Sequence, residues 1–205
     1  MKKLLLTIFF IFGLSGLISA QAVFESKTFE FSIAKPANWY LRENVRLRDA
    51  LKDVELTDEN LYGVLKTFEG ALLVAFQKYD PQTETGVNPI IQVNIRPKPT
   101  KDFRVFKEAL IKNSESLFKN LKDYKMVEPP REVEISGIKS VFFALTFKYN
   151  AKDGTEMTVR SRTYAVPYKN YFFQINFNDG SRGQRNEDAS KEFDELLKTI
   201  KIGRN

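Results

Sequence analysis

Apolar and polar residues alternate near the start of the chain. Residues 28–34 carry an apolar side chain at every second position, namely Phe29, Phe31 and Ile33. This two-residue period predicts a strand with one buried face. Pro36 lacks a backbone donor and disfavours a helical conformation at Lys35, so the strand is expected to end there. Trp39, the only tryptophan, is expected to cover the end of the core.

Further strands are predicted along most of the chain. Two of them, residues 71–79 and 89–97, flank a turn-rich loop. The others follow one another in the second half: residues 131–139, 140–150, 155–166 and 171–179. Turns at residues 152–154, which contain Asp-Gly, and at residues 167–170 predict that the last three of these strands form an antiparallel meander.

Two segments have the 3.6-residue period of an amphipathic helix. Residues 102–122 begin at Asp102, a suitable N-cap, and carry one apolar stripe: Phe103, Phe106, Leu110, Leu117, Phe118 and Leu121. The second helix is expected at about residues 186–198, with Phe193 and Leu196 on its inner side. Residues 40–70 show mixed signals and predict irregular structure with one or two short helical turns.

The order of these elements resembles the Mog1/PsbP-like family. The resemblance is carried by FSIAKPANW at residues 31–39, NPIIQVN at residues 88–94 and FDELLKTIKI at residues 193–202. It implies an α+β fold, an α/β/α sandwich around an antiparallel sheet, in which residues 28–34 form the first sheet strand.

The family comprises mostly non-enzymatic proteins: accessory subunits of photosystem II, a regulator of the Ran GTPase, and exported bacterial proteins of unknown role. The chain lacks the metal-binding and protein-binding residues particular to those members, so the resemblance implies the fold and not their functions.

The first twenty residues have the layout of a secretory signal peptide, with Lys2 and Lys3 before an uncharged apolar run and small residues at the end. Cleavage is expected after Ala20 or Ala22, which leaves residues 21–205 as a single domain in the periplasm or secreted. The chain then meets a membrane only through this transient segment. An uncleaved anchor stays open as an alternative, because the apolar run is close to the shortest length that spans a bilayer.

The chain contains neither histidine nor cysteine. It therefore lacks the usual general base, the usual thiol nucleophile and the usual ligands of zinc or copper, and it forms no disulfide. We predict no cofactor and no metal site. The formal charge of +6 is made of interspersed acids and bases rather than a concentrated basic stripe, so no nucleic-acid partner is expected.

Hydrolase chemistry based on a carboxylate pair or a Ser-Lys dyad remains an alternative. Ser136 and Lys139 have the Ser-x-x-Lys spacing, but Gly137 between two strands indicates a turn. The acidic group at residues 53–59 lacks the spacing of a calcium loop. We predict no catalytic residue and no metal ligand.

Polar residues gather on one side of several predicted strands, because successive side chains point to opposite faces. If the strands share one register, this side carries Gln92, Asn94, Arg160, Arg162, Gln174 and Asn176. Such a face is either simply solvated or a shallow site for an anionic or peptide-like partner, since the guanidinium fork suits carboxylates and phosphates.

The sequence thus favours a non-catalytic, exported accessory domain that binds a protein or a small anionic ligand. A hydrolase-type enzyme would need a cleft with convergent acids of perturbed pKa. A structural envelope component, the further alternative, would self-associate through an unpaired sheet edge.

Overall fold

The computed structural model describes residues 22–43, 65, 71–80, 82, 86–118, 120–150, 154–182 and 185–203. The predicted signal peptide, the acidic group at residues 53–59 and most of the segment expected to be irregular lie outside these residues. No helix in the described part of the chain is long and apolar enough to cross a membrane.

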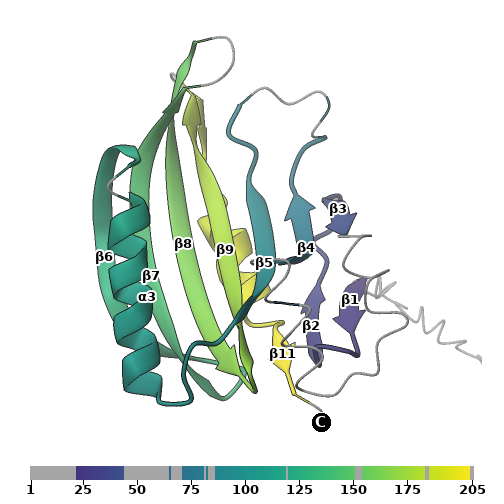
Figure 1. The fold of residues 1–205 in the computed structure, drawn as a ribbon. Helices are drawn as coiled ribbons and strands as arrows, with labels where there is room; N and C mark the ends of the chain where they lie inside the picture. The colour runs from purple at the N-terminus through teal and green to yellow at the C-terminus, as the bar shows by residue number, and fades with distance from the viewer. Residues whose placement is uncertain are drawn as a thin grey trace, which may run out of the picture.

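The main layer is an eight-stranded antiparallel sheet (Figure 1). Its strand order is β3 (Tyr40–Glu43), β4 (Ala71–Gln77), β5 (Ile90–Pro97), β9 (Tyr171–Arg182), β8 (Glu156–Tyr168), β7 (Ile138–Asn150) and β6 (Lys122–Ile135). A short strand, β10 (Arg185–Glu187), pairs with the end of β9. The predicted three-strand meander is confirmed as β7 to β9, with Lys169 and Asn170 forming the last turn. The strand predicted at residues 131–139 is instead divided by a turn at Ser136 and Gly137, and β6 pairs with β7 as a fourth strand.

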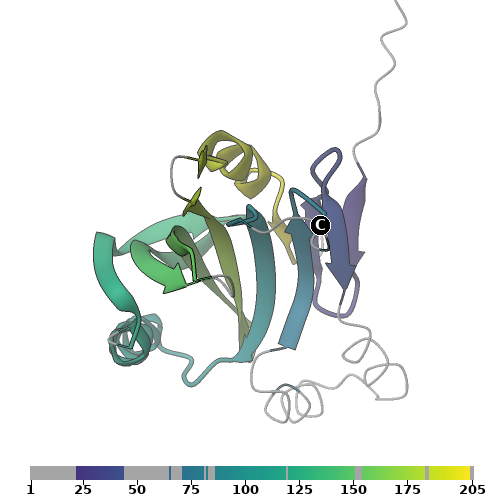
Figure 2. The ribbon, with the colours of Figure 1, turned by 90° about the horizontal axis from the view of Figure 1, so that it is seen from above.

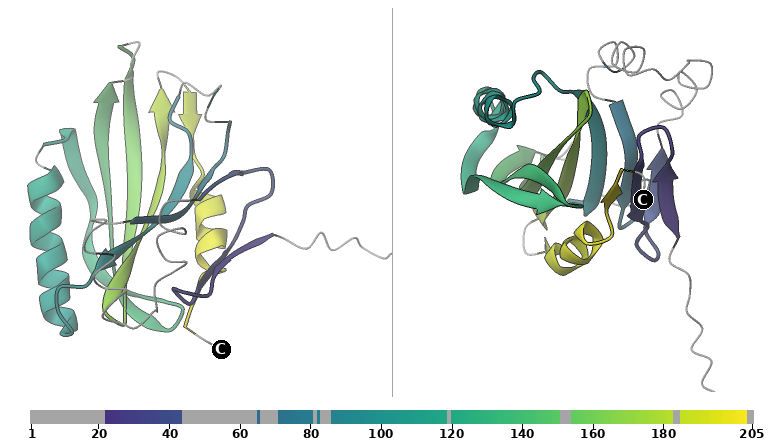
Figure 3. Two further views of the ribbon diagram at one scale, coloured as in Figure 1. Left: turned by 45° about the vertical axis from the view of Figure 1, so that its right-hand side comes forward. Right: turned by 90° about the horizontal axis from the view of Figure 1, so that it is seen from below.

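A second sheet of three strands stands beside β4 and β5 (Figure 3). It consists of β1 (Val23–Ser26), β2 (Phe31–Ala34) and the short β11 (Lys201–Ile202). The strand predicted at residues 28–34 therefore begins only at Phe31 and belongs to this small sheet rather than to the main one. Residues 27–30 form a turn instead, in which Glu30 has a φ of 50°.

One described helix lies on each side of the large sheet (Figure 2). Helix α3 (Phe103–Phe118) packs Phe106 against Val141, Ala165 and Phe172. Its N-cap is as predicted, since Asp102 Oδ1 accepts from the Val105 N–H at 3.0 Å. The helix ends at Phe118 rather than residue 122, and Leu121 lies beyond it.

Helix α4 (Ser190–Leu197) covers the opposite side of the sheet with Phe193 and Leu196. It starts later than predicted because residues 185–187 form β10. Strands therefore dominate the described structure. One described helix covers each side of the large sheet, whereas the expected α/β/α sandwich has a layer of helices on each side.

The larger core lies between the large sheet, α4 and the small sheet. Phe31 packs on Phe173 with ring centroids 4.9 Å apart, and Trp39 meets Phe193 at 6.4 Å. The Pro-Ala-Asn-Trp corner after β2 thus places the single tryptophan against α4, as the sequence suggested for a residue covering the end of the core.

Candidate functional site

The strand register divides the polar residues predicted from the sequence between two faces. Gln92 lies opposite Asn176 and Asn94 opposite Gln174, so these amides share one face. Arg162 lies opposite Phe177, whose ring belongs to the core under α4, and Arg160 is two residues away on the same strand. The prediction that all of these residues share one face is therefore wrong. The amides lie on the α3 side of the sheet, and the arginines lie on the α4 side.

The cause of this error is that both faces of β8 are covered. Ala165 packs under α3, whereas Val166 belongs to the core on the α4 side. Apolar residues thus occur at both odd and even positions of β8, and its pattern does not reveal which face the arginines share.

Arg160 holds several elements together. Its Nε donates to Oδ1 of Asp179 at 2.6 Å, its Nη1 to Asn186 Oδ1 at 2.7 Å and its Nη2 to the Glu187 carbonyl at 2.7 Å. The guanidinium therefore links β8 to β9 and β10. Arg162 makes a looser contact with Asp194 of α4, with its Nη1 3.0 Å from Oδ1.

The amides belong to a larger polar patch on the α3 side of the sheet, which we call the amide face. Two rows run directly across β5, β9 and β8: Gln92, Asn176 and Thr163, and then Asn94, Gln174 and Ala165. The full patch comprises Gln92, Asn94, Arg96, Ser161, Thr163, Gln174, Asn176 and Asn178. The alternation of apolar and polar residues along β5 and β9 also places Arg96 and Asn178 on this face. Ser161 and Thr163 were not predicted there, because the pattern of β8 does not reveal which of its residues share the face.

Hydrogen bonds order part of the amide face. Asn176 Oδ1 accepts from Thr163 Oγ1 at 3.0 Å and from Gln174 Nε2 at 3.4 Å. Gln77 lies opposite Ile90 on the same side of the sheet, and its buried Oε1 has no hydrogen-bond partner among the described residues. The face therefore contains two amides ordered by hydrogen bonds and one buried carbonyl oxygen without a donor among the described residues.

The amide face carries positive charge but no carboxylate from the described residues of its strands. Within β4, β5, β8 and β9 the carboxylates are Glu156 and Asp179, and both lie on the opposite face, in line with Arg160. Arg96 is exposed and lies two residues beyond Asn94. Among the described residues of these strands, no carboxylate faces the amides.

More cations follow Arg96 along the chain. The Lys98 N–H donates to the Asn170 carbonyl at 3.0 Å, which holds this segment against the β8–β9 turn. Burial lowers the pKa of Lys98, and the nearby ammonium of Lys101 adds to this effect. The end of the amide face next to α3 is thus basic. Figure 1 shows α3 in front of β6 and β7, with β8, β9 and β5 facing the viewer beside it.

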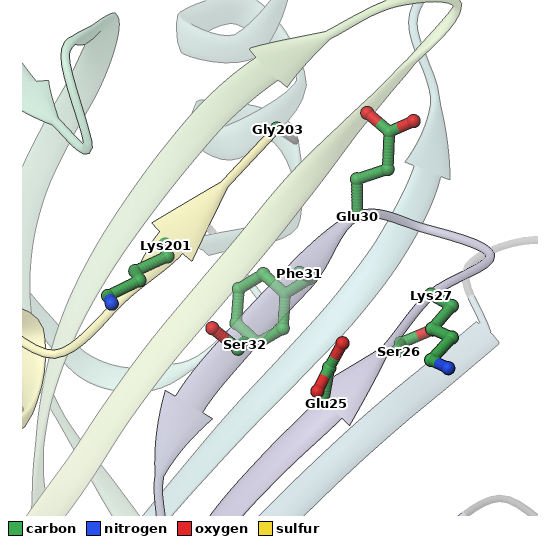
Figure 4. A pocket seen from close by; sticks show the side chains of 8 residues that line it. All are labelled: Glu25, Ser26, Lys27, Glu30, Phe31, Ser32, Lys201 and Gly203. Atoms are coloured by element: carbon green, nitrogen blue, oxygen red, sulfur yellow. The ribbon is translucent and has the colours of Figure 1, made fainter. Parts of the chain in front are cut away.

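A second feature is a groove of about 600 Å³ on the small sheet, which we call the small-sheet groove (Figure 4). Its lining includes Glu25, Lys27, Glu30, Ser32, Lys201 and Gly203. The Glu30 carboxylate accepts from the Tyr168 hydroxyl and pairs with Lys169 Nζ at 3.0 Å. The Gly203 N–H donates to the Glu30 carbonyl at 2.8 Å. These bonds fix one wall of the groove.

The Ser-x-x-Lys pair has structural partners. Ser136 Oγ accepts from the Ile202 N–H at 3.0 Å, in a turn where Ser136 and Gly137 both have positive φ. Lys139 Nζ lies 2.8 Å from Glu132 and over the Phe103 ring. No cluster of three or more potential metal ligands occurs in the described part of the chain.

No protein-family model matches the chain, and no curated protein matches it in sequence. Among solved structures it is similar to PsbP (CyanoP) from Synechocystis sp. PCC 6803, with 10% identity and a TM-score of 0.47 over 92% of this chain and 96% of that one. LpqN of Mycobacterium tuberculosis, involved in cell envelope biogenesis, matches with 12% identity and a TM-score of 0.47 over 92% of this chain and 88% of that one.

The Ran-binding protein Mog1p of Saccharomyces cerevisiae matches with 11% identity and a TM-score of 0.46 over 89% of this chain and 95% of that one. The chain is similar in fold to PsbP and to Mog1p, the proteins that give the resembled family its name. At these identities, and with TM-scores below 0.5, the similarity carries no conclusion about function.

Proposed function

We propose that this chain is a non-catalytic, exported domain that binds a protein partner as an accessory or assembly factor, and that the partner docks on the amide face. The observation that carries the proposal is the composition of this face. Amides and hydroxyls from β5, β9 and β8 lie side by side there, and Arg96 adds one positive charge. The described carboxylates of β4, β5, β8 and β9 all lie on the opposite face of the sheet.

Amide side chains suit recognition of a protein surface. Each offers two N–H donors and a carbonyl acceptor, so Gln92, Asn94 and Gln174 can pair with backbone groups of either polarity. The Gln174 and Asn176 side chains already share hydrogen bonds with each other and with Thr163, so they lose little side-chain freedom on binding. The basic end at Arg96, Lys98 and Lys101 favours a partner surface that carries carboxylates, and it would raise the rate of encounter at low salt.

Export is proposed from the N-terminal sequence, whose Lys-led apolar run resembles a signal peptide. The mature domain would then meet its partner in the periplasm or outside the cell. The roles found for Ser136 and Lys139 in a turn and an ion pair favour binding over Ser-Lys hydrolysis.

Affinity capture with the mature chain from an envelope extract of its own cell tests this proposal. The Asn94→Ala/Gln174→Ala variant removes two facing amides, and Arg162→Ala is the control on the opposite face. We expect a protein that is retained by the wild type and by the control and is reduced about tenfold by the amide variant. Equal retention by all of these, with both variants folded, would refute the amide face as the binding site.

A further inference from the structure

Charged residues of the small-sheet groove are aligned across its strands. Glu25 of β1 lies opposite Ser32 of β2, and Ser32 lies opposite Lys201 of β11. Residues in such a row share one face, and this face points away from the core, because Phe31 and Ile33 on the other face are buried. The row therefore presents a carboxylate, a hydroxyl and an ammonium group in this order across the sheet.

These charges have no partner within the described structure. The side chains of Glu25, Lys27 and Lys201 make no hydrogen bond or ion pair with any described residue. Glu30 differs, since its carboxylate is bonded by Tyr168 and Lys169 and only 11% of its side chain is exposed. Figure 4 shows Glu25 and Lys201 on two different strands, with Ser32 of β2 between them. The groove thus presents unpaired charges of opposite sign on its two sides.

The spacing of the row selects a ligand length. Adjacent strands lie about 4.8 Å apart, so the backbones of Glu25 and Lys201 are separated by roughly 10 Å. An extended dipeptide spans about 7 Å between its ammonium and its carboxylate. A dipeptide that lies across the three strands therefore directs its two termini toward the two charges, and the Glu25 and Lys201 side chains are long enough to close the remaining distance.

We propose that the small-sheet groove binds a zwitterionic dipeptide with free termini. The ammonium of the ligand pairs with Glu25, its carboxylate pairs with Lys201, and its peptide group meets the Ser32 hydroxyl. Lys27 supplies a second cation, so a dipeptide with an acidic side chain binds better than a neutral one. The groove is open, so the expected dissociation constant is roughly millimolar.

A titration of the ¹⁵N-labelled mature chain with Gly-Gly and Gly-Glu, followed by NMR, measures this binding. We expect saturable shifts at Glu25, Ser32 and Lys201, and a several-fold lower dissociation constant for Gly-Glu that is lost in Lys27→Gln. N-acetyl-Gly-Gly and Gly-Gly-amide, which each lack one terminal charge, should bind at least about fivefold more weakly. Absence of saturable shifts with either dipeptide overturns the proposal.

Charge reversal distinguishes a defined site from general attraction to a charged surface. Glu25→Lys and Lys201→Glu should each abolish Gly-Gly binding, because one terminus then meets a like charge. The double variant Glu25→Lys/Lys201→Glu should restore it, since the ligand can bind in the opposite direction. Failure of the double variant to recover binding while it remains folded would also overturn the proposal.

Discussion

Arg160 and Asp179 form the ion pair that joins the large sheet to the start of α4. Asp179 Oδ1 accepts from Arg160 Nε at 2.6 Å, and Oδ2 accepts from the Ala189 N–H at 2.8 Å, directly before the helix. Only 3% of Asp179 is exposed, whereas 35% of the Arg160 side chain is. The contact thus holds α4 against the large sheet. Because the Arg160 guanidinium is bonded within the domain, Arg160 is a poor candidate for binding a partner.

Asp179→Ala is expected to destabilise the domain by about 2–3 kcal/mol. The substitution leaves the Arg160 guanidinium and the Ala189 N–H without their acceptor, and the cost stays below that of a fully buried pair because Arg160 is partly solvated. Thermal unfolding should show a melting temperature lower by roughly 5–10 °C. Asp194→Ala, which removes the exposed partner of Arg162, is the control and should cost less than about 1 kcal/mol.

Gly180 is required by close packing between β8 and β9. A Cβ at this position would lie 2.1 Å from the Thr158 carbonyl oxygen, a backbone atom that cannot move without disturbing the sheet. Gly180→Ala should therefore destabilise the domain by about 2 kcal/mol or more, measured by denaturant unfolding. Ser181→Ala, the next residue on β9, is the comparison, and equal stability of the two variants would contradict the packing argument.

The Tyr168 hydroxyl joins the β8–β9 turn to the turn before β2 through Glu30. Tyr168→Phe removes this donor from a mostly buried carboxylate and should cost about 1–2 kcal/mol in the free energy of unfolding. Tyr149→Phe removes a hydroxyl from a tyrosine that is 51% exposed and should change stability by less than about 0.5 kcal/mol. A loss no larger for Tyr168→Phe than for Tyr149→Phe would show that the contact is not formed.

Glu156 should titrate at unusually low pH. Lys122 and Lys148 each donate to its carboxylate, at 2.7 Å and 2.5 Å, and they lower its pKa from 4.5 to about 2. A depressed folded-state pKa means that the contribution to stability is present above about pH 4.5 and is lost as the pH falls toward 2. NMR titration of the carboxyl should show this pKa, and Lys148→Gln should raise it; an ordinary value in the wild type would contradict the contact.

The outer edge of β6, which pairs with no other described strand, is interrupted where Pro129 and Pro130 meet a register shift between Glu128 and Arg131. Proline has no N–H for a neighbouring strand, so the pair should prevent edge-to-edge association. Pro129→Val/Pro130→Val is expected to raise the fraction of oligomer in analytical ultracentrifugation. An unchanged monomer fraction at equal stability would show that this edge is protected in another way.

The amides were predictable because β5 and β9 have one strictly apolar side. Ile91, Val93 and Ile95 alternate with Gln92 and Asn94, and Phe173, Ile175 and Phe177 alternate with Gln174 and Asn176. Two adjacent antiparallel strands of this kind bury their apolar sides together, so their polar sides coincide. On β8, with cores on both faces, the same reasoning placed Arg160 and Arg162 on the wrong side.

The small sheet could not be predicted as a unit. β11 has two residues and pairs with β2, about 170 positions earlier in the sequence, and such remote pairing leaves no local pattern. The start of β6 was missed because Pro129 and Pro130 indicate an interruption, whereas the strand accommodates them at a bulge and begins at Lys122. The small-sheet groove depends on this pairing and was therefore also missed.

Site-specific photo-crosslinking in the living cell tests the central claim most directly. A photoreactive phenylalanine analogue is placed at Asn94 or Gln174 on the amide face and, in a separate variant, at Arg162 on the opposite face. The amide-face positions should each give the same discrete adduct with one protein partner, and Arg162 should give none. Adducts from Arg162 alone, or no adduct from either amide position while the variants are exported and folded, would contradict the amide face as the partner-binding surface.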